Sequence, residues 1–374
     1  ISRRRFYGTE IPIWYCKKCS EPHVPEPGKY YRPWNQKCPI ANCTKCKSTE
    51  FIGEERTFDT WMDSSVSPLF ISKFGKDEEF FKKVYPASIR PQAKDIVRTW
   101  LYYTLLRCEE LTGEKPWSKA WVMGYGLDEK GMKMSKSKGN AIDPLPVIEK
   151  LGADTFRFWS ASEINHGYDF RCNEQKIEST RKFLSKLWNV SRFLSSFPVI
   201  DAGITNPSDK WILSELDKLV KECKKGYEEY NFFIPAIAIR EFTWNVFAAH
   251  YIEMVKARAY GINFSDEERD GAIFTLHKTL ATILKLLAPI TPFITEHLWK
   301  ILYSNESIHK EKQVDVENIE EQTEITKQIS EFNSKVWNEK KSQNLSLKDS
   351  IEIEIPETLK PFEKDLKSMH NLLD

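Results

Sequence analysis

A short segment near the middle of the chain concentrates side chains that bind phosphate. The segment GMKMSKSKGN, residues 131–140, contains three lysines, at 133, 136 and 138, with two serines between them. Lysine ammonium groups pair with phosphate oxygens, and serine hydroxyls donate hydrogen bonds to the same atoms. Mobile cations that meet these oxygens stabilise the charge that develops when a group at phosphorus is displaced. The segment is therefore a candidate site for phosphate chemistry. The alternative is a solvated run of lysines, but the flanking glycines, which allow the loop to move, favour a functional loop.

Cysteines form the second candidate site. Of eight cysteines, five lie within the first 46 residues, and four of these form the pairs CKKC at 16–19 and CTKC at 43–46. Each pair can approach one metal ion from a tight turn, and two such turns complete a tetrahedral zinc site. The sequence predicts structural zinc bound by Cys16, Cys19, Cys43 and Cys46, with no position left open for water. Two alternatives stay open: Cys38 replaces Cys43, or the cysteines are reduced and bind no metal.

Composition limits the classes of function. The chain has 374 residues, 41% of them hydrophobic and 29% charged, which is typical of a folded protein with more than one domain. No apolar run reaches the length of about 18 residues that a membrane-spanning helix needs, and no export signal is recognisable, so we expect a cytoplasmic protein without membrane contact. The net charge of +1 means that any nucleic-acid site must be a local basic patch. Because the sequence opens on isoleucine, we expect it to belong to a longer protein.

The lysine segment lies in a region of mixed strands and helices. Residues 1–58 contain short strand-like pieces at 11–16 and 50–54 around the cysteines. Residues 59–170 predict a helix over 95–113, ended by Gly113, and a buried strand over 119–126. After the lysines, Asp143 and Pro144 predict a helix start and Gly152 its end. A strand, a polar loop and a helix N-terminus form the arrangement with which α/β proteins bind phosphates.

Long helices dominate the rest of the chain. Residues 171–310 predict an antiparallel helix bundle, and residues 311–374 a linker with a small α/β appendage that includes a strand at 350–356. In the first helix, over 174–194, the spacing places five apolar residues on the inner face: Ile177, Leu184, Leu187, Trp188 and Leu194. By the same spacing we expect two further sets in the core: Trp244, Phe247 and Tyr251, and Leu280, Leu284 and Leu287. Thr291 and Pro292 predict a helix start after the break at Pro289.

These segments resemble a known family. KMSKS, residues 133–137, resembles the second signature of class I aminoacyl-tRNA synthetases, and its frame through ADTFRFW is similar to the subgroup for valine, isoleucine and leucine. FDTWMDSSVSP and RPQAKDIVRTW resemble the valyl-tRNA synthetases of archaeal type, and ISRRRFYGTEIPIWYC resembles the point of return from their editing domain. FTWNVFAAHYIEMVK and LLAPITPFITEHLW are similar to the helical anticodon-binding domain. One departure is Ala93-Lys94, where the family usually has Gly-His.

The resemblance implies a fold and a reaction. The fold would be the second half of a Rossmann-type catalytic domain with a zinc knuckle, followed by the helix bundle and the appendage. The reaction would join ATP and valine into valyl-adenylate, with Mg²⁺ accompanying ATP, and then transfer valine to tRNA(Val). The alternatives are a part of an isoleucyl-tRNA synthetase, or a tRNA-binding module without catalysis. A monomer is expected. Because no segment matches the family's HIGH-type signature or editing domain, we expect the isolated chain to be inactive.

The resemblance also implies roles for single residues. Lys133 and Lys136 would bind the triphosphate and stabilise the transition state, and Ser135 and Ser137 would support the closed loop. Asp95 would accept hydrogen bonds from the adenosine ribose, and Trp61 would line the amino-acid pocket, although a core aromatic is the alternative for Trp61. Candidate tRNA contacts, each with a solvated helix face as its alternative, are Arg181, Lys182, Lys186 and Arg192.

Overall fold

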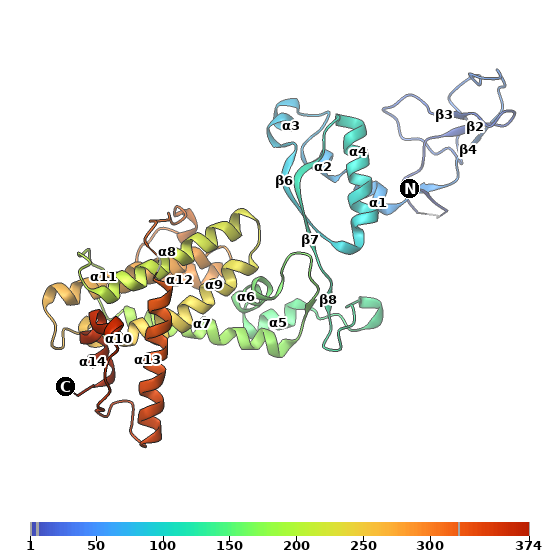
Figure 1. Ribbon diagram of the computed structural model, residues 1–374. Helices are drawn as coiled ribbons and strands as arrows, with labels where there is room; N and C mark the ends of the chain where they lie inside the picture. The colour runs from blue at the N-terminus through green and yellow to red at the C-terminus, as the bar shows by residue number, and fades with distance from the viewer. Residues whose placement is uncertain (1, 5–6, 321, 374) are drawn as a thin grey trace. The chain divides into compact units, whose positions relative to one another are not determined.

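The computed structural model describes residues 2–4, 7–320 and 322–373 (Figure 1). Part of the segment 1–16, which carries one of the resemblances, therefore lies outside the described residues. The chain divides into two units, Ile1–Met123 and Gly124–Asp374, and each is described by itself. No helix in the described part of the chain is both long and apolar enough to cross a membrane.

The first unit begins with short antiparallel strands around the cysteines. Trp14, which is 1% exposed, anchors the central strand, and its neighbours pair with it through Trp14–His23 and Cys16–Phe51. The strands predicted at 11–16 and 50–54 are confirmed, with narrower bounds. The three-stranded sheet has the order β3-β2-β4, formed by β2 (Trp14–Cys16), β3 (Pro22–His23) and β4 (Phe51–Gly53), and a separate pair joins β1 (Ser2–Arg3) to β5 (Thr57–Phe58).

The remainder of the first unit contains a parallel pair of strands, β6 (Ala87–Ala93) and β7 (Trp117–Met123). The helix predicted over 95–113 ends at Gly113 as expected, because this residue takes the left-handed conformation that glycine adopts without strain. The helix begins less regularly than the sequence predicts, with a tight turn, η1 (Lys94–Ile96), and a π-helical turn, η2 (Val97–Leu101), before α4 (Tyr102–Thr112). Three short helices precede the strands: α1 (Thr60–Ser64), α2 (Ser67–Ile71) and α3 (Glu78–Val84).

The second unit opens with the lysine segment and two helices. Asp143 caps α5 (Pro144–Leu151), accepting a hydrogen bond from the backbone of Leu145, and Gly152 follows the helix, so both predicted ends are confirmed. The flanking elements are β8 (Gly126–Leu127), which pairs in parallel with β9 (Phe170–Arg171), a tight turn η3 (Lys136–Lys138), and α6 (Ala153–Glu163).

Helices α7 to α12 form most of the second unit (Figure 1). Their buried apolar side chains form one core cluster, in which Phe158 of α6 stacks on Phe183 of α7 with ring centres 4.6 Å apart. The three leucines of α11 that were expected in the core, Leu280, Leu284 and Leu287, are fully buried. The bounds are α7 (Glu174–Leu194), α8 (Pro207–Glu228), α9 (Phe233–Glu241), η4 (Phe242–Tyr251), α10 (Ile252–Ala259), α11 (Asp266–Leu287), α12 (Pro292–Leu302) and η5 (Ile308–Lys310).

Two tryptophans predicted in the core are exposed, and these predictions are wrong. Trp188 is 42% exposed and stacks on His297 at 5.7 Å, because it lies at the edge of the inner face of α7. Trp244 is 38% exposed, although Phe247 and Tyr251 are fully buried as expected. The element η4 is a π-helix, whose wider turn changes which positions share a face. The ordinary helical spacing therefore misplaced Trp244.

The segment 311–374 is mainly helical and packs on the same core. Ile329, Val336 and Leu366 are fully buried in that cluster. The strand predicted at 350–356 is an extended segment with a single β-bridge, Ile351 to Leu372, because no second extended segment runs alongside it among residues 322–373. The elements are α13 (Thr323–Ser342), η6 (Glu357–Phe362) and α14 (Glu363–His370).

A chain of buried polar groups joins this segment to η4. The Asn333 amide donates to Nδ1 of His250 at 2.9 Å, and Nε2 of His370 contacts Oδ1 of Asn333 at 2.8 Å. Lys340, which is fully buried, donates to the carbonyl oxygens of Leu347 and His370. Burial, together with the positive charge of Lys340, lowers the pKa of His370 from 6.5 to about 4. The neutral form of His370 is therefore required in the folded chain.

This arrangement predicts a loss of stability in acid. Because His370 binds a proton less readily in the folded than in the unfolded chain, its stabilising contribution is complete above pH 6.5 and is lost as the pH falls to about 4. The contribution is at most about 3 kcal/mol. Urea unfolding at pH 7 and pH 4 should show a larger loss for the native chain than for His370→Gln, with His309→Gln at an exposed position as the control. Equal losses for the native chain and His370→Gln would contradict the assignment.

Candidate functional site

The lysine segment is a loop with defined anchor points. Met134 donates its backbone N–H to the carbonyl of Gly126, and Lys133 forms a β-bridge with Leu127, so the first half of the loop returns along β8. The Met134 side chain packs on the apolar cluster around Val147 and Trp159. The methionine between the lysines thus fixes the loop to α5 and α6, while the lysines themselves are exposed.

Asn140 and Asp128 close the loop. The amide nitrogen of Asn140 donates to Asp128 at 2.8 Å and to the carbonyl of Lys133 at 3.3 Å, while its oxygen accepts from the backbone of Ser135 at 2.9 Å. The other Asp128 oxygen accepts the backbone N–H of Met132 at 2.8 Å. The hydrogen bonds from Asn140 and from the backbone of Met132 hold the pKa of Asp128 below its usual value. We call these two side chains the loop clasp, because they tie the two ends of the segment together.

The predicted phosphate-binding side chains lie on the outer part of this loop. Lys133 and Lys136 are both exposed, and the Lys133 ammonium lies 3.9 Å from the centre of the Tyr125 ring, a cation–π contact. The hydroxyls of Ser135 and Ser137 lie 2.7 Å apart. The loop therefore presents two ammonium groups and a pair of hydroxyls, a donor set suited to phosphate oxygens.

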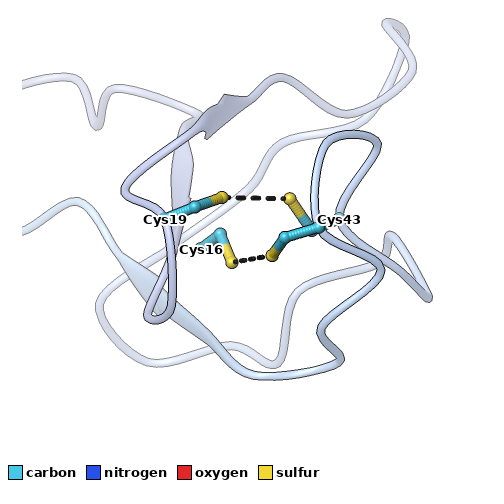
Figure 2. Close-up of side chains that lie close together, drawn as sticks. Cys16, Cys19 and Cys43 are labelled. Atoms are coloured by element: carbon cyan, nitrogen blue, oxygen red, sulfur yellow. Dashed lines mark hydrogen bonds between the residues drawn. The ribbon is translucent and has the colours of Figure 1, made fainter.

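The four predicted cysteine ligands meet at one point. The sulfurs of Cys16 and Cys46 lie 3.5 Å apart, as do those of Cys19 and Cys43, and all four lie within 4.8 Å of one another. Figure 2 shows the sulfurs of Cys19 and Cys43 directed toward each other from two separate turns. Zn–S bonds of about 2.3 Å place the thiolates of a tetrahedral site roughly 3.8 Å apart, so this donor set fits zinc.

The two turns that carry the cysteines have the same backbone geometry. The residue after each pair, Ser20 and Lys47, has a φ of 60° and 59° respectively, and each donates its N–H to the carbonyl of the first cysteine of its pair. Cys38 lies outside the cluster, and burial raises the pKa of its thiol. The geometry thus favours Cys43 over Cys38, a choice that the sequence left open.

The pKa values of two cysteines in the cluster are shifted in opposite directions. Burial raises the pKa of Cys43, but backbone amides of its own turn and the side chain of His23 outweigh burial and lower the pKa to about 6. Although the backbone amide of Glu21 lowers it, burial and the neighbouring sulfurs raise the pKa of Cys19 to about 12. Four crowded thiols cannot all ionise without a compensating cation, which a divalent metal would supply.

A basic cleft lies between α7 and η4. It has a volume of about 410 Å³ and contains three of the four predicted tRNA contacts together with the exposed Trp244. The Lys186 ammonium lies 5.8 Å from the centre of the Trp244 ring. Arg192 is exposed on the same helix but does not line the cleft. The lining residues are Glu178, Arg181, Lys182, Ser185, Lys186, Asn189 and Trp244.

Two models of known protein families match parts of this chain. Residues 1–172 match the family described as tRNA synthetases class I (I, L, M and V), and residues 209–355 match the anticodon-binding domain of tRNA ligases. These two segments are therefore domains of aminoacyl-tRNA synthetases, the first of them of class I. The resemblance read from the sequence is thereby confirmed.

Curated relatives of this synthetase chain are valine–tRNA ligases. It is 42% identical to the valine–tRNA ligase of Aeropyrum pernix over 99% of this chain and 46% of the relative. The corresponding values are 43%, 100% and 48% for Pyrobaculum aerophilum, and 41%, 100% and 49% for Nanoarchaeum equitans. The chain thus spans about half the length of the curated relatives that it matches.

Solved structures show the class I synthetase fold. A leucyl-tRNA synthetase from Agrobacterium radiobacter, in a ternary complex with tRNA and LeuAMS, has a TM-score of 0.62 at 21% identity, covering 84% of this chain and 42% of that one. Methionyl-tRNA synthetase from Mycobacterium tuberculosis, in complex with methionyl-adenylate, has a TM-score of 0.57 at 21% identity, covering 68% and 52%.

The two other synthetase positions predicted from the sequence lie in the first unit. Asp95 is exposed and lies two residues after β6, at the carboxyl end of a parallel strand, where α/β folds bind ligands. Trp61 is 40% exposed on α1, so it is not a core aromatic. Asp59 caps α1 by accepting the backbone N–H of Trp61 at 2.9 Å. The lysine loop belongs to the other unit.

Several residues at these sites could not be recognised as functional from the sequence. The motif does not reveal that Asn140 and Asp128 bind each other, although Asp before a Lys-Gly turn is a common signal for backbone capping. Trp244 was missed because no local signal marks a π-helix. His23, whose Nε2 lies 3.4 Å from the Cys43 sulfur, has no recognisable spacing relative to the cysteine pairs.

The loop clasp predicts that the lysine loop is cut slowly by proteases. Replacing Asn140 by alanine removes three hydrogen bonds, each worth about 1 kcal/mol, so the loop should open more often. Trypsin should cut the Asn140→Ala chain after the loop lysines up to about a hundredfold faster than the native chain, as followed by mass spectrometry. Asn305→Ala, at an exposed position outside the loop, should leave the rate unchanged. Native rates in Asn140→Ala would show that the clasp does not hold the loop.

Proposed function

We propose that this chain is the part of a valine–tRNA ligase that supplies the KMSKS loop and binds tRNA. The observation that carries this proposal is the match to valine–tRNA ligases at 41–43% identity over nearly the whole chain. The whole enzyme would activate valine with ATP and pass it to tRNA(Val). It would act in the cytoplasm as a monomer, as the resemblance implies.

The proposed chemistry is a displacement at phosphorus. A carboxylate oxygen of valine attacks the α-phosphate of ATP, forming the bond of valyl-adenylate, while the bond to the β-phosphate breaks and pyrophosphate leaves. Lys136 and Lys133 would meet the oxygens on which charge increases, and the Ser135 and Ser137 hydroxyls would donate to them. Mg²⁺ bound to ATP would share this charge. The exposure of both lysines and the anchoring of the loop by Met134 support this assignment.

Lys133 would have to leave Tyr125 to act. The cation–π contact holds its ammonium above the ring at 3.9 Å in this structure. Such a contact is worth about 0.5–1 kcal/mol at an exposed site, much less than pairing with a triphosphate provides. Binding of ATP can therefore outweigh this contact. Asp95 would hold the ribose and Trp61 would line the valine pocket, both from the first unit.

Buried polar atoms without hydrogen-bond partners support the proposal that strands β6 and β7 of the first unit are part of a larger sheet. Gln92 on β6 is only 4% exposed, yet neither amide atom has a hydrogen-bond partner among the described residues. Parallel sheets occur almost only with both faces covered, and two strands alone cannot achieve this. We infer that β6 and β7 belong to a Rossmann-type sheet completed by the HIGH-containing half. The 374-residue chain should accordingly show no valine-dependent ATP–pyrophosphate exchange, and clear turnover would contradict this inference.

The basic cleft is the proposed contact for unpaired tRNA bases. Arg181, Lys182 and Lys186 would meet phosphates, and the exposed Trp244 face would stack on a base. Arg192 would extend the contact along α7. Lys176, a neighbouring basic residue, pairs with Glu163 at 3.0 Å and is a weaker candidate.

The cleft predicts two separable effects on tRNA(Val) binding. Trp244→Ala should weaken binding to the 374-residue chain by roughly tenfold, with a similar salt dependence, because it removes stacking rather than charge. Lys186→Gln should lower the slope of log affinity against log salt by about one, because it removes a phosphate contact. Filter binding at several salt concentrations measures both, with Lys310→Gln as a control at an exposed pair outside the cleft. If neither variant differs from the control, the cleft is not the tRNA site.

The proposed zinc site predicts that substitutions of two cysteines have different effects on the zinc content. Zinc bound by Cys16, Cys19, Cys43 and Cys46 requires Cys43→Ser to lose the metal, because three thiolates leave the site open. Cys38→Ser should keep one zinc per chain, since its sulfur lies outside the cluster. Mass spectrometry of the metal content of both purified variants tests this assignment. Zinc loss from Cys38→Ser with retention in Cys43→Ser would reverse it.

A further inference from the structure

His23 lies beside the metal centre without belonging to either cysteine pair. Its Nε2 is 3.4 Å from the Cys43 sulfur, and the two residues are 5% and 0% exposed. The ring is positioned independently of the sulfur, because His23 pairs with Trp14 in the sheet and packs edge-on against Phe51, with ring centres 5.2 Å apart. A fixed imidazole therefore faces one buried thiolate.

A zinc ion with four thiolates carries two excess negative charges, which outer hydrogen bonds disperse. Backbone amides supply such bonds toward Cys16 and Cys43 from their own turns. Apart from the cysteines themselves, His23 provides the one side-chain hydrogen bond to these sulfurs that is found in residues 2–4, 7–320 and 322–373. Like the contact between Cys16 and Cys46, it joins the β3-β2-β4 sheet to the second turn, at 43–46.

We propose that His23 is a positioning residue of the metal centre. Its Nε2–H donates to the Cys43 thiolate, fixes the orientation of that ligand and slows the release of zinc. This inference rests on the zinc site proposed above. His23 acts through Cys43 and does not bind the metal, because the four sulfurs already complete a tetrahedral set.

Two substitutions separate the hydrogen bond from the packing of the ring. His23→Phe keeps a ring against Phe51 but has no donor, whereas His23→Gln keeps an N–H donor but has no ring. Zinc content is measured first, and then the rate at which each 374-residue chain transfers zinc to a coloured chelator, 4-(2-pyridylazo)resorcinol. The cobalt-substituted chains report the ligand set through their sulfur-to-metal absorption. Val24→Ala, at the exposed neighbouring position, is the control.

The expected result is one zinc in every chain, with release about tenfold faster from His23→Phe and near the native rate from His23→Gln and Val24→Ala. Faster release from His23→Gln with a native rate in His23→Phe would assign His23 to ring packing and overturn the inference. Native rates in both variants would also overturn it. A cobalt spectrum of three sulfurs and one nitrogen would show that His23 is itself a ligand. A native chain without zinc would overturn the zinc site as well, which distinguishes the two failures.

Discussion

Asp154, on α6, links the elements that carry the lysine loop and the basic cleft. Its carboxylate accepts the backbone N–H of Phe293 at 3.4 Å and of Ile294 at 2.6 Å, at the start of α12. The predicted cap residue of that helix, Thr291, makes no side-chain capping bond, so a residue of α6 performs this role from more than a hundred positions away. One turn later, Arg157 donates to the carbonyls of Pro289 and Ile290.

These contacts between α6 and the start of α12 determine where the lysine loop and the basic cleft lie. α5 and α6 follow directly after the lysine loop, and Met134 packs on the cluster that includes Trp159 of α6. The other face of α6 packs on α7, which carries the cationic side of the cleft. A change in the position of α6 would therefore move the loop and the cleft together. The proposed transfer of an activated amino acid to tRNA needs such a link, because the site of chemistry and the site of tRNA recognition must act on one molecule.

The sequence was most informative where local chemistry alone decides the structure. Asp143, Gly152 and Gly113 end or begin their helices as predicted, because capping depends on residues within one turn. The four cysteines meet as their spacing predicts, because each pair folds as an independent turn. The exposed lysines of the loop were recognisable from their order. In each of these cases, neighbours in the sequence are also neighbours in space.

The remaining features depend on contacts between distant residues. Nothing near Thr291 indicates that Asp154 replaces it, and nothing near Trp244 indicates a π-helix that turns the ring toward Lys186. Arg258 is another example: it is fully buried between Asp209 and Asp365, with bonds of 2.7 to 3.1 Å, and joins α8, α10 and α14. Buried ion pairs of this kind are recognised only in the folded structure, because in the sequence each charged residue is expected to lie on the surface.

The central proposal is that this chain recognises the tRNA of a valine–tRNA ligase. Competition binding tests it most directly: labelled tRNA(Val) is bound to the 374-residue chain and displaced by unlabelled tRNA(Val) or tRNA(Ile) at one salt concentration. We expect tRNA(Val) to displace the label at a concentration at least about tenfold lower than tRNA(Ile) does, a difference of roughly 1.4 kcal/mol. Equal displacement by tRNA(Ile), or no binding of either tRNA, would contradict it.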